Sequence, residues 1–385
     1  MSDRKVVVTG TSVTTALGSH VPDVWDRLRN GDSGLSSARS PHDSKSIGDT
    51  PAINRPAGRI PDFAPARLLS LDRRSLRRMD RFVQLAMMAA ETAFHDADPV
   101  LQHHPPQRCG VIIGSCFGGV STIETQHERQ RARGPERVSA FLIPSLMINA
   151  ASGNVAVHWG LKGISFGLSA TCASGIQAIG TAYRMIRSGQ ADMMLCGAAE
   201  APLCDLVFAG LEAMDSPSRH ETLRHQRCVP AEGAGLLILE DFDSAARRGA
   251  NVIAEVVGYG QSFGSVTTTT DPNGEVPGLA QSLQAALTDA NCEPSRVGQI
   301  VADAWRPDLH EADAETDIRH VLGKSAGLQT WNHQRQLGHA FGASGAINAA
   351  LTVYAMQQEW LAPKSNVLVC SSGFGGQNAV ICLLQ

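Results

Sequence analysis

The sequence predicts an α/β protein built from two related halves. Short apolar runs alternate with helical patterns, and these runs lack the polar alternation of strands with one wet face. In addition, a stretch that opens a helix and then leads into a strand occurs twice. Such features are typical of a sheet whose strands are buried on both faces by helices.

The apolar runs are expected to form strands in the order KVVVTG, CGVIIGS, ADMMLCGA, AGLLILED, IAEVVGYG, QIVADA, NVLVCSS and NAVICLLQ. Helical patterns lie between them, for example over residues 79–97 and 277–290. Residues 32–70 are rich in Ser, Pro and Asp, which predicts a surface loop.

The repeat sets the correspondence between the halves. An Ala-Ser-Gly triplet opens a helix at residues 173–175 and again at residues 343–345. The following strands then match, apart from about four extra residues around Pro363, a difference that loops tolerate. We therefore predict two units, residues 1–245 and residues 246–385.

In this register Cys172 corresponds to Gly342, and Ser169 corresponds to His339. A pseudo-twofold relation between the halves would bring Cys172 and His339 into one shared site.

Composition narrows the function classes. The 385 residues carry a net charge of −4, which argues against nucleic acid as the main partner. No apolar run is long enough to span a bilayer, and the charged start predicts no signal peptide. The 9 Cys are scattered without a Cys-x-x-Cys pair, so we expect no metal site and a reducing, cytoplasmic location.

Cys172 is the candidate nucleophile because it lies just ahead of a predicted helix. Free backbone N–H groups and the helix dipole at such a position favour a thiolate. The same N–H groups would hold an oxyanion during acyl transfer. The alternative, a packed structural cysteine, remains open on local sequence alone.

Motifs spread along nearly the whole chain resemble those of the β-ketoacyl synthases of the thiolase superfamily. They are VVVTGTSVTTALG, RRMDRFVQLAMMAAETAF, VPAEGAGLLILED, LGHAFGASGA and GFGGQNAVI, in that order. The resemblance implies a thiolase-like five-layered αβαβα fold and a dimer. It also implies an acyl carrier protein as partner, with an acyl or malonyl thioester on its phosphopantetheine as substrate and no further cofactor.

The resemblance assigns roles to residues that match the motifs. Cys172 matches the nucleophile and His339 matches the second of two catalytic histidines. Ser372, Gly373 and Phe374 match the segment whose backbone helps form an oxyanion hole, and Ser372 stands where a gating Phe is usual. The terminal glycine motif continues through Gly375, Gly376 and Asn378.

The chain departs from the family pattern at two positions. Trp305 replaces the first catalytic histidine, and Gln334 replaces the supporting lysine. Arg335 and His310 are weak candidates to substitute for the missing groups. Decarboxylation produces an enolate whose oxygen must be held by donors, so we expect acylation of Cys172 to survive and decarboxylation to be impaired.

The stretch ADAWRPDLHEADAE resembles chain length factors, the ketosynthase-like partner subunits of type II polyketide synthases. This resemblance predicts a subunit that pairs with an active ketosynthase in polyketide or fatty-acid-type biosynthesis. The alternative is an atypical β-ketoacyl synthase or acyltransferase that uses Cys172 as acyl acceptor, as a homodimer. A third hypothesis, thiolase chemistry with Cys370 as second thiol, is weaker than a structural role for Cys370.

Two arginine-rich stretches are candidate docking sites for an acidic carrier protein, although charge runs are usually solvated faces. Their arginines are Arg73, Arg74, Arg77, Arg78 and Arg81 in the first, and Arg129, Arg131, Arg133 and Arg137 in the second. The segment with Phe141, Ile148 and Asn149 resembles a dimer-interface and tunnel segment, with ordinary core packing as the alternative.

Overall fold

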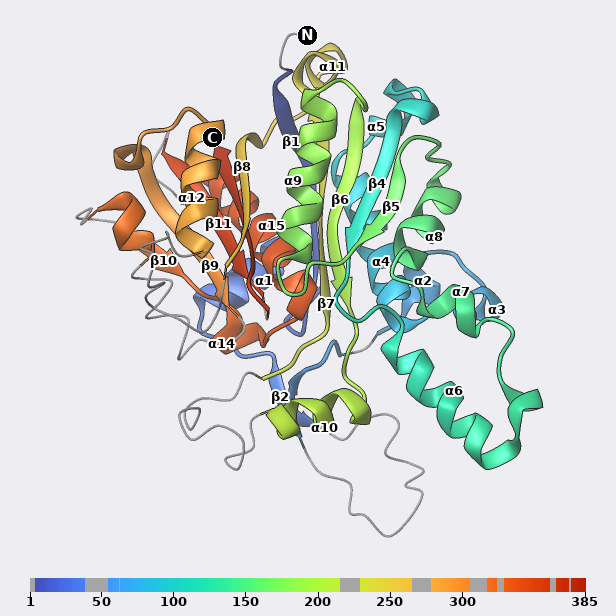
Figure 1. Cartoon of the computed structure of the whole chain (residues 1–385). Coiled ribbons are helices and arrows are strands. Elements are labelled where there is room, and N and C mark those ends of the chain that lie inside the picture. Colours follow the sequence, from blue (N-terminus) through green and yellow to red (C-terminus); the bar gives the residue numbers. More distant parts are fainter. Residues whose placement is uncertain are drawn as a thin grey trace.

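The computed structural model describes residues 4–38, 55–61, 63–214, 229–264, 278–304, 317–323, 329–360, 365–373 and 375–385 (Figure 1). The strands are β1 (Val6–Thr14), β2 (Leu35–Ala38), β3 (Arg55–Gly58), β4 (Cys109–Gly114), β5 (Ser165–Leu168), β6 (Met193–Glu200), β7 (Gly233–Asp241), β8 (Ala254–Phe263), β9 (Val297–Ala304), β10 (Gln329–Trp331), β11 (Asn366–Ser372) and β12 (Gln377–Leu384). All the apolar runs predicted as strands are strands.

The α-helices include the two predicted from their periodicity, α4 and α12. Their bounds are α1 (Val21–Arg29), α2 (Pro65–Leu68), α3 (Arg73–Leu76), α4 (Arg81–Asp96), α5 (Val100–His103), α6 (Val120–Arg133), α7 (Leu142–Leu146), α8 (Ala150–Trp159), α9 (Ser174–Arg187), α10 (Asp205–Met214), α11 (Phe242–Arg247), α12 (Gly278–Asp289), α14 (Gln334–Leu337) and α15 (Ser344–Gln357).

The sheet shows the duplication directly. Its 10 strands run in the order β10-β9-β11-β12-β8-β1-β7-β6-β4-β5. From the centre outwards, β1-β7-β6-β4-β5 repeats the pattern of β8-β12-β11-β9-β10. In each set the inner neighbours pair antiparallel and the outer ones pair parallel. The two sets join where Val6, Val7 and Val8 of β1 pair with β8.

Three apolar cores separate the layers. One lies between α4 and α8 and the outer face of the first set of strands. A second surrounds α9 and α15, which lie side by side between the two sets (Figure 1). A third lies under α12 on the outer face of the second set. Helices therefore cover both faces of both sets, which gives the thiolase-like five-layered fold that the resemblance implies.

The predicted surface loop over residues 32–70 is wrong in part. Residues 35–38 and 55–58 form β2 and β3, which pair as a two-stranded sheet. Short polar strands carry no apolar run, so composition alone did not indicate them. Residues 39–54 lie outside the described residues.

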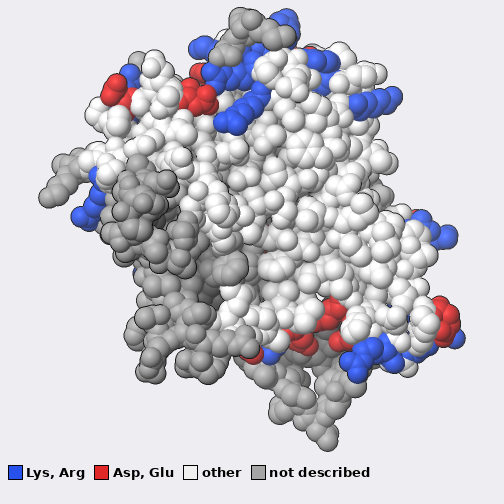
Figure 2. Space-filling view, in the orientation of Figure 1, with Lys and Arg blue, Asp and Glu red and all other residues white. Residues whose placement is uncertain are grey.

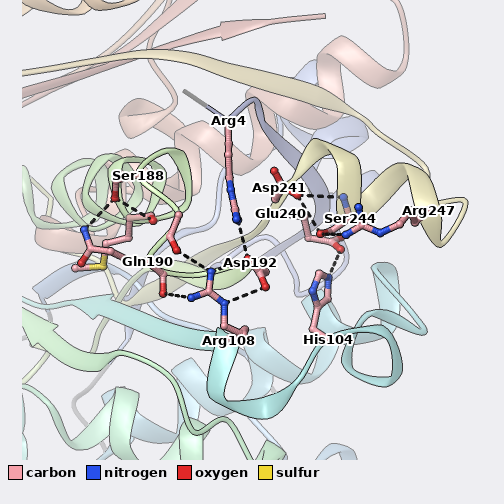
Figure 3. Close-up of polar contacts among 12 residues, drawn as sticks. Arg4, His104, Arg108, Ser188, Gln190, Asp192, Glu240, Asp241, Ser244 and Arg247 are labelled. Carbon is pink, nitrogen blue, oxygen red and sulfur yellow. Dashed lines mark hydrogen bonds and ion pairs between the residues drawn. The ribbon is translucent and has the colours of Figure 1, made fainter. Parts of the chain in front are cut away.

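Buried carboxylates join the elements at the end of the sheet far from the carboxyl ends of β4 and β6 (Figure 3). Glu240 of β7 is bonded to Thr9, to His104 at 2.7 Å and to Arg248 at 2.6 and 2.9 Å. Burial raises the pKa of Glu240, but these bonds outweigh burial and lower the pKa to about 2. This cluster therefore ties β1 and β7 to α5 and α11.

Candidate active site

Cys172 lies on a tight turn between β5 and α9. Thr171 adopts a left-handed backbone conformation with φ of 50°. The Ala170 N–H donates to Ser174 Oγ at 2.8 Å, which closes the turn. Such a conformation is rare for residues other than glycine and is held only where the surroundings over-determine it.

The second half repeats this turn at the expected position. Phe341 has φ of 45°, and the Ala340 N–H donates to Ser344 Oγ at 2.8 Å. Gly342 thus occupies the place that Cys172 has in the first half. A Cβ at Gly342 would lie 2.8 Å from Glu200 Oε1, so this second turn has no room for a side chain.

The pseudo-twofold relation places Cys172 and His339 together, as the repeat predicted. Cys172 Sγ lies 3.3 Å from His339 Nε2, and the two residues are 2% and 1% exposed. The backbone of His339 is held on both sides, because its N–H donates to Val229 O and its carbonyl accepts from Ala231 N, both at 2.8 Å.

Close approach of α9 and α15 makes this geometry possible. A Cβ at Gly175 would lie 2.8 Å from Ala346 Cβ and 2.8 Å from Gly342 O. A Cβ at Gly345 would lie 2.7 Å from Ile176. Glycine at these two positions lets the helices cross near the turns that carry the sulfur and the imidazole.

A chain of buried polar groups continues from the other side of His339. Gln334 Nε2 lies 2.6 Å from His339 Nδ1 and also donates to Asp303 at the end of β9. Asp303 Oδ1 is 3.4 Å from His339 Nδ1. Gln334 thus takes the position of the family lysine and contacts the imidazole with a neutral amide. Arg335, the adjacent candidate, is exposed.

The surroundings of Cys172 favour the thiolate. A hydrogen bond from Cys116 and the proximity of His339 outweigh burial and lower the pKa of Cys172 to about 5. The same contact and burial hold the pKa of the Cys116 thiol well above its ordinary value. Burial raises the pKa of Glu200, whose carboxylate accepts from the Cys116 N–H, to about 8.

Sequence reasoning missed Cys116, Glu200 and Asp303. Glu200 and Asp303 stand at the carboxyl ends of β6 and β9, and Cys116 follows β4 by two residues. In open α/β sheets, sites form outside the carboxyl ends of the strands. A polar residue at the carboxyl end of an apolar run could therefore have indicated Glu200 and Asp303 as candidate site residues.

The residues matched to the oxyanion hole are only partly described. Ser372 Oγ donates to Asn378 Oδ1 at 2.8 Å, and the Gly373 N–H donates to Gln377 O at 2.8 Å. A Cβ at Gly373 would lie 3.1 Å from Cys172 N, so this backbone lies against the nucleophile turn. Phe374, Trp305 and His310 lie outside the described residues. The oxyanion role of this segment stays a prediction.

Aromatic rings cover the imidazole. The ring of Phe341 lies 5.1 Å from that of His339, and the ring of Phe117 meets Phe341 edge-on at 4.9 Å. Cys370 lies elsewhere, in the core under α12, where burial raises the pKa of its thiol to about 12. A structural role for Cys370 fits this placement.

The arginine-rich stretches differ in their contacts. Arg81 binds Glu232 with two bonds of 2.6 and 2.7 Å, and Arg78 lies over the Phe141 ring. The remaining arginines of the two stretches are exposed. Among the helices described, none is long and apolar enough to cross a membrane.

Comparisons with known proteins agree along the chain. A model of the β-ketoacyl synthase N-terminal domain matches residues 3–245, and one of the C-terminal domain matches residues 253–368. A 3-oxoacyl-acyl-carrier-protein synthase 2 of Staphylococcus aureus (strain COL) is 31% identical over 414 residues, covering 98% of each chain. A synthase of the same description from Vibrio cholerae is 32% identical, covering 97% of this chain and 91% of the relative.

Two solved structures are similar over the whole fold. The ishigamide ketosynthase/chain length factor has a TM-score of 0.85 at 27% identity and covers 100% of both chains. A type II PKS acyl-carrier protein in complex with its ketosynthase bound to the hexaketide gives a TM-score of 0.82 at 28% identity, covering 100% of this chain and 99% of that one.

Proposed function

The chain belongs to the β-ketoacyl synthase family, and from that premise we propose that it is a chain-length-factor-like subunit. In this proposal it pairs with an active ketosynthase in acyl-carrier-protein-dependent polyketide or fatty-acid-type biosynthesis. Its own capacity for decarboxylation is impaired. The substrate that reaches its site is an acyl or malonyl thioester on the phosphopantetheine of a carrier protein.

The contact between Gln334 and His339 carries this proposal. A lysine at this position would place a positive charge beside the imidazole, and Gln334 supplies only an amide at 2.6 Å from Nδ1. The sequence also has Trp305 at the position of the other histidine. Each donor to a developing oxyanion contributes about 3–4 kcal/mol to its stabilisation. Loss of the histidine that Trp305 replaces is therefore enough to slow decarboxylation about 10²–10³-fold.

An apolar surface at the β5 edge of the sheet supports pairing with a second subunit. β5 is an edge strand of the sheet and contacts α8, and the segment from α7 to α8 exposes large apolar side chains. These are Ile143 at 62%, Met147 at 44% and Val157 at 85% exposure. Figure 2 shows charged side chains around the edges of this view, and an uncharged middle in front of α9 and β5.

Co-expression with a type II ketosynthase tests the pairing. We expect the two chains to co-purify, and Val157→Glu to release the partner. A matched change at the exposed Leu206 (60% exposed), Leu206→Glu, lies on α10 and leaves pairing intact. Recovery of the wild-type chain as a stable homodimer with normal elongation activity contradicts the proposal.

Restoration of the family residues tests the impaired chemistry. Wild-type protein is expected to release CO₂ from malonyl carrier protein very slowly. The double variant Trp305→His and Gln334→Lys gains at least about 10²-fold, because the imidazole at position 305 supplies one donor to the enolate and the lysine restores a positive charge beside His339. Arg335→Lys, which alters the adjacent exposed residue, is the control and leaves the rate unchanged.

The lowered pKa of Cys172 favours a second candidate function, an acyltransferase or atypical β-ketoacyl synthase. A thiolate 3.3 Å from an imidazole is able to take an acyl group from a thioester. Intact-protein mass spectrometry after exposure to acyl carrier protein or acyl-coenzyme A tests this function. An adduct on wild type that is absent from Cys172→Ala supports it; equal adducts on both exclude it.

A further inference from the structure

The buried polar chain beyond His339 has a direction that its donors and acceptors determine. We propose that Asp303 is a positioning residue that sets the protonated nitrogen of His339. It orients the Gln334 amide so that the imidazole proton sits on Nε2 and faces Cys172 Sγ. This inference deepens the proposed function and depends on it only for the claim that Cys172 meets an acyl thioester.

Asp303 is fixed from both of its oxygens. The residue is 2% exposed and lies one position before the end of β9, beside Ser371 of β11. Oδ1 accepts from Gln334 Nε2, and Oδ2 lies 3.4 Å from the Ser371 hydroxyl. Ser371 Oγ is also 3.0 Å from the Cys172 carbonyl oxygen. The carboxylate is therefore held in one place relative to the nucleophile turn.

The carboxylate decides which end of the amide faces the imidazole. An ionised carboxylate only accepts hydrogen bonds, so the amide end that faces Asp303 is the NH₂ group. The same Nε2 is 2.6 Å from His339 Nδ1. One of its hydrogens points to Asp303, and the other points to Nδ1. The reverse orientation would bring Gln334 Oε1 against a carboxylate oxygen, two acceptors that repel each other.

A second donor agrees with this assignment. Ser344 Oγ accepts the Ala340 N–H at 2.8 Å and lies 3.4 Å from His339 Nδ1, so its own proton is able to point at Nδ1. The Gln334 amide nitrogen lies closer to Nδ1, at 2.6 Å, than Asp303 Oδ1 does, at 3.4 Å. Nδ1 is therefore assigned as the acceptor, and the proton of the neutral imidazole lies on Nε2. Gln334 and Asp303 together provide the donor that the family obtains from a lysine, without its positive charge.

This arrangement defines what His339 does during acylation. The Cys172 thiolate attacks the thioester carbonyl, a C–S bond forms, and Nε2–H donates to the negative oxygen or to the sulfur. The intermediate then collapses, and the carrier sulfur leaves as a thiolate that takes a proton from water. Because Nε2 already holds its proton, His339 is a donor and does not deprotonate water or an alcohol. The acyl-Cys172 thioester is therefore expected to resist hydrolysis.

Nitrogen NMR of protein labelled with ¹⁵N-histidine tests the assignment on the chain alone. The His339 signals are identified by their loss in His339→Gln. At alkaline pH we expect an unprotonated Nδ1 and a protonated Nε2. A protonated Nδ1 in the wild-type protein overturns the proposal.

Asp303→Asn separates positioning from charge. Its side chain has nearly the same shape, but it is able to present either a donor or an acceptor to Gln334. We expect a mixture of the two imidazole tautomers and acylation of Cys172 slowed about tenfold, the effect of one hydrogen bond to a charged group. A purely Coulombic role predicts a different result: the charge of Asp303 raises the pKa of Cys172, so its removal would lower that pKa further and leave the imidazole tautomer unchanged.

Ser371→Ala is the matched control, since it removes the contact with Oδ2 and keeps that with Oδ1. It should leave the tautomer unchanged. If Asp303→Asn does not fold, Gln334→Met replaces it, and the loss of the amide is again expected to mix the tautomers. An unchanged tautomer in a folded variant contradicts the proposal. Pairing with a ketosynthase is measured separately, so failure of the proposed function and failure of this inference are distinguishable.

Discussion

Replacement of Cys116 tests how the protein keeps the Cys172 sulfur ionised. The hydrogen bond from the Cys116 thiol is the largest cause of the low pKa of Cys172, which is about 5. A hydrogen bond to a charged group contributes about 1.5–3 kcal/mol, which corresponds to roughly one to two pKa units. Cys116→Ala is therefore expected to move the midpoint of thiolate formation upwards by that amount.

The assay is the rate of Cys172 alkylation by iodoacetamide as a function of pH, followed by mass spectrometry of the peptide. At about pH 6 the wild-type sulfur is about 90% thiolate, whereas the variant is about 10–50% thiolate, so its rate falls about two- to tenfold. Cys370→Ala is the control, because the Cys370 thiol lies in another core. Superimposable profiles for wild type and Cys116→Ala, or a wild-type midpoint near the ordinary cysteine value, would refute this reasoning.

Further predictions concern stability. Glu240, with its pKa lowered to about 2, stabilises the fold above the ordinary glutamate pKa of 4.5 and loses this effect as pH falls through 2; the difference in unfolding free energy between wild type and Glu240→Gln should shrink between these values in denaturant titrations. Glu200 has its pKa raised to about 8, so wild type should lose stability relative to Glu200→Gln as pH rises from 4.5 towards 8, and parallel curves would contradict this. Gly175→Ala places a Cβ 2.8 Å from Ala346 and should cost about 1–3 kcal/mol by thermal unfolding. Gly153→Ala, with nothing within 4 Å, should be neutral or stabilising by up to about 1 kcal/mol.

The fold was predictable from the sequence because its strands are buried on both faces. A strand of this kind is a continuous apolar run, as in β4 and β6, and every residue of both is buried. The strands at the two ends of the sheet, β5 and β10, were missed. Each has only 3 or 4 residues, and an end strand has a neighbour on one side alone, so neither produces a long apolar run.

The site was predictable only where the repeat defined a register. The correspondence of Cys172 with Gly342 led to His339, and the two turns share the same backbone conformation. Asp303 and Cys116 have no counterpart in that argument. Their positions depend on the order of the strands in the sheet, which brings residues far apart in sequence to the same edge. That order could not be inferred from the apolar runs and the repeat.

The two equivalent turns, which carry Cys172 and Gly342, have a consequence for the number of acyl groups that one chain could accept. At one of them a sulfur fits, and at the other the Glu200 carboxyl fills the space that any side chain at Gly342 would need. Duplication alone would have produced two symmetric attachment points per polypeptide. The buried acid leaves no space for the second, so the acylation proposed for Cys172 would place a single acyl group on each chain, and titration with a reactive thioester should saturate at one equivalent per chain.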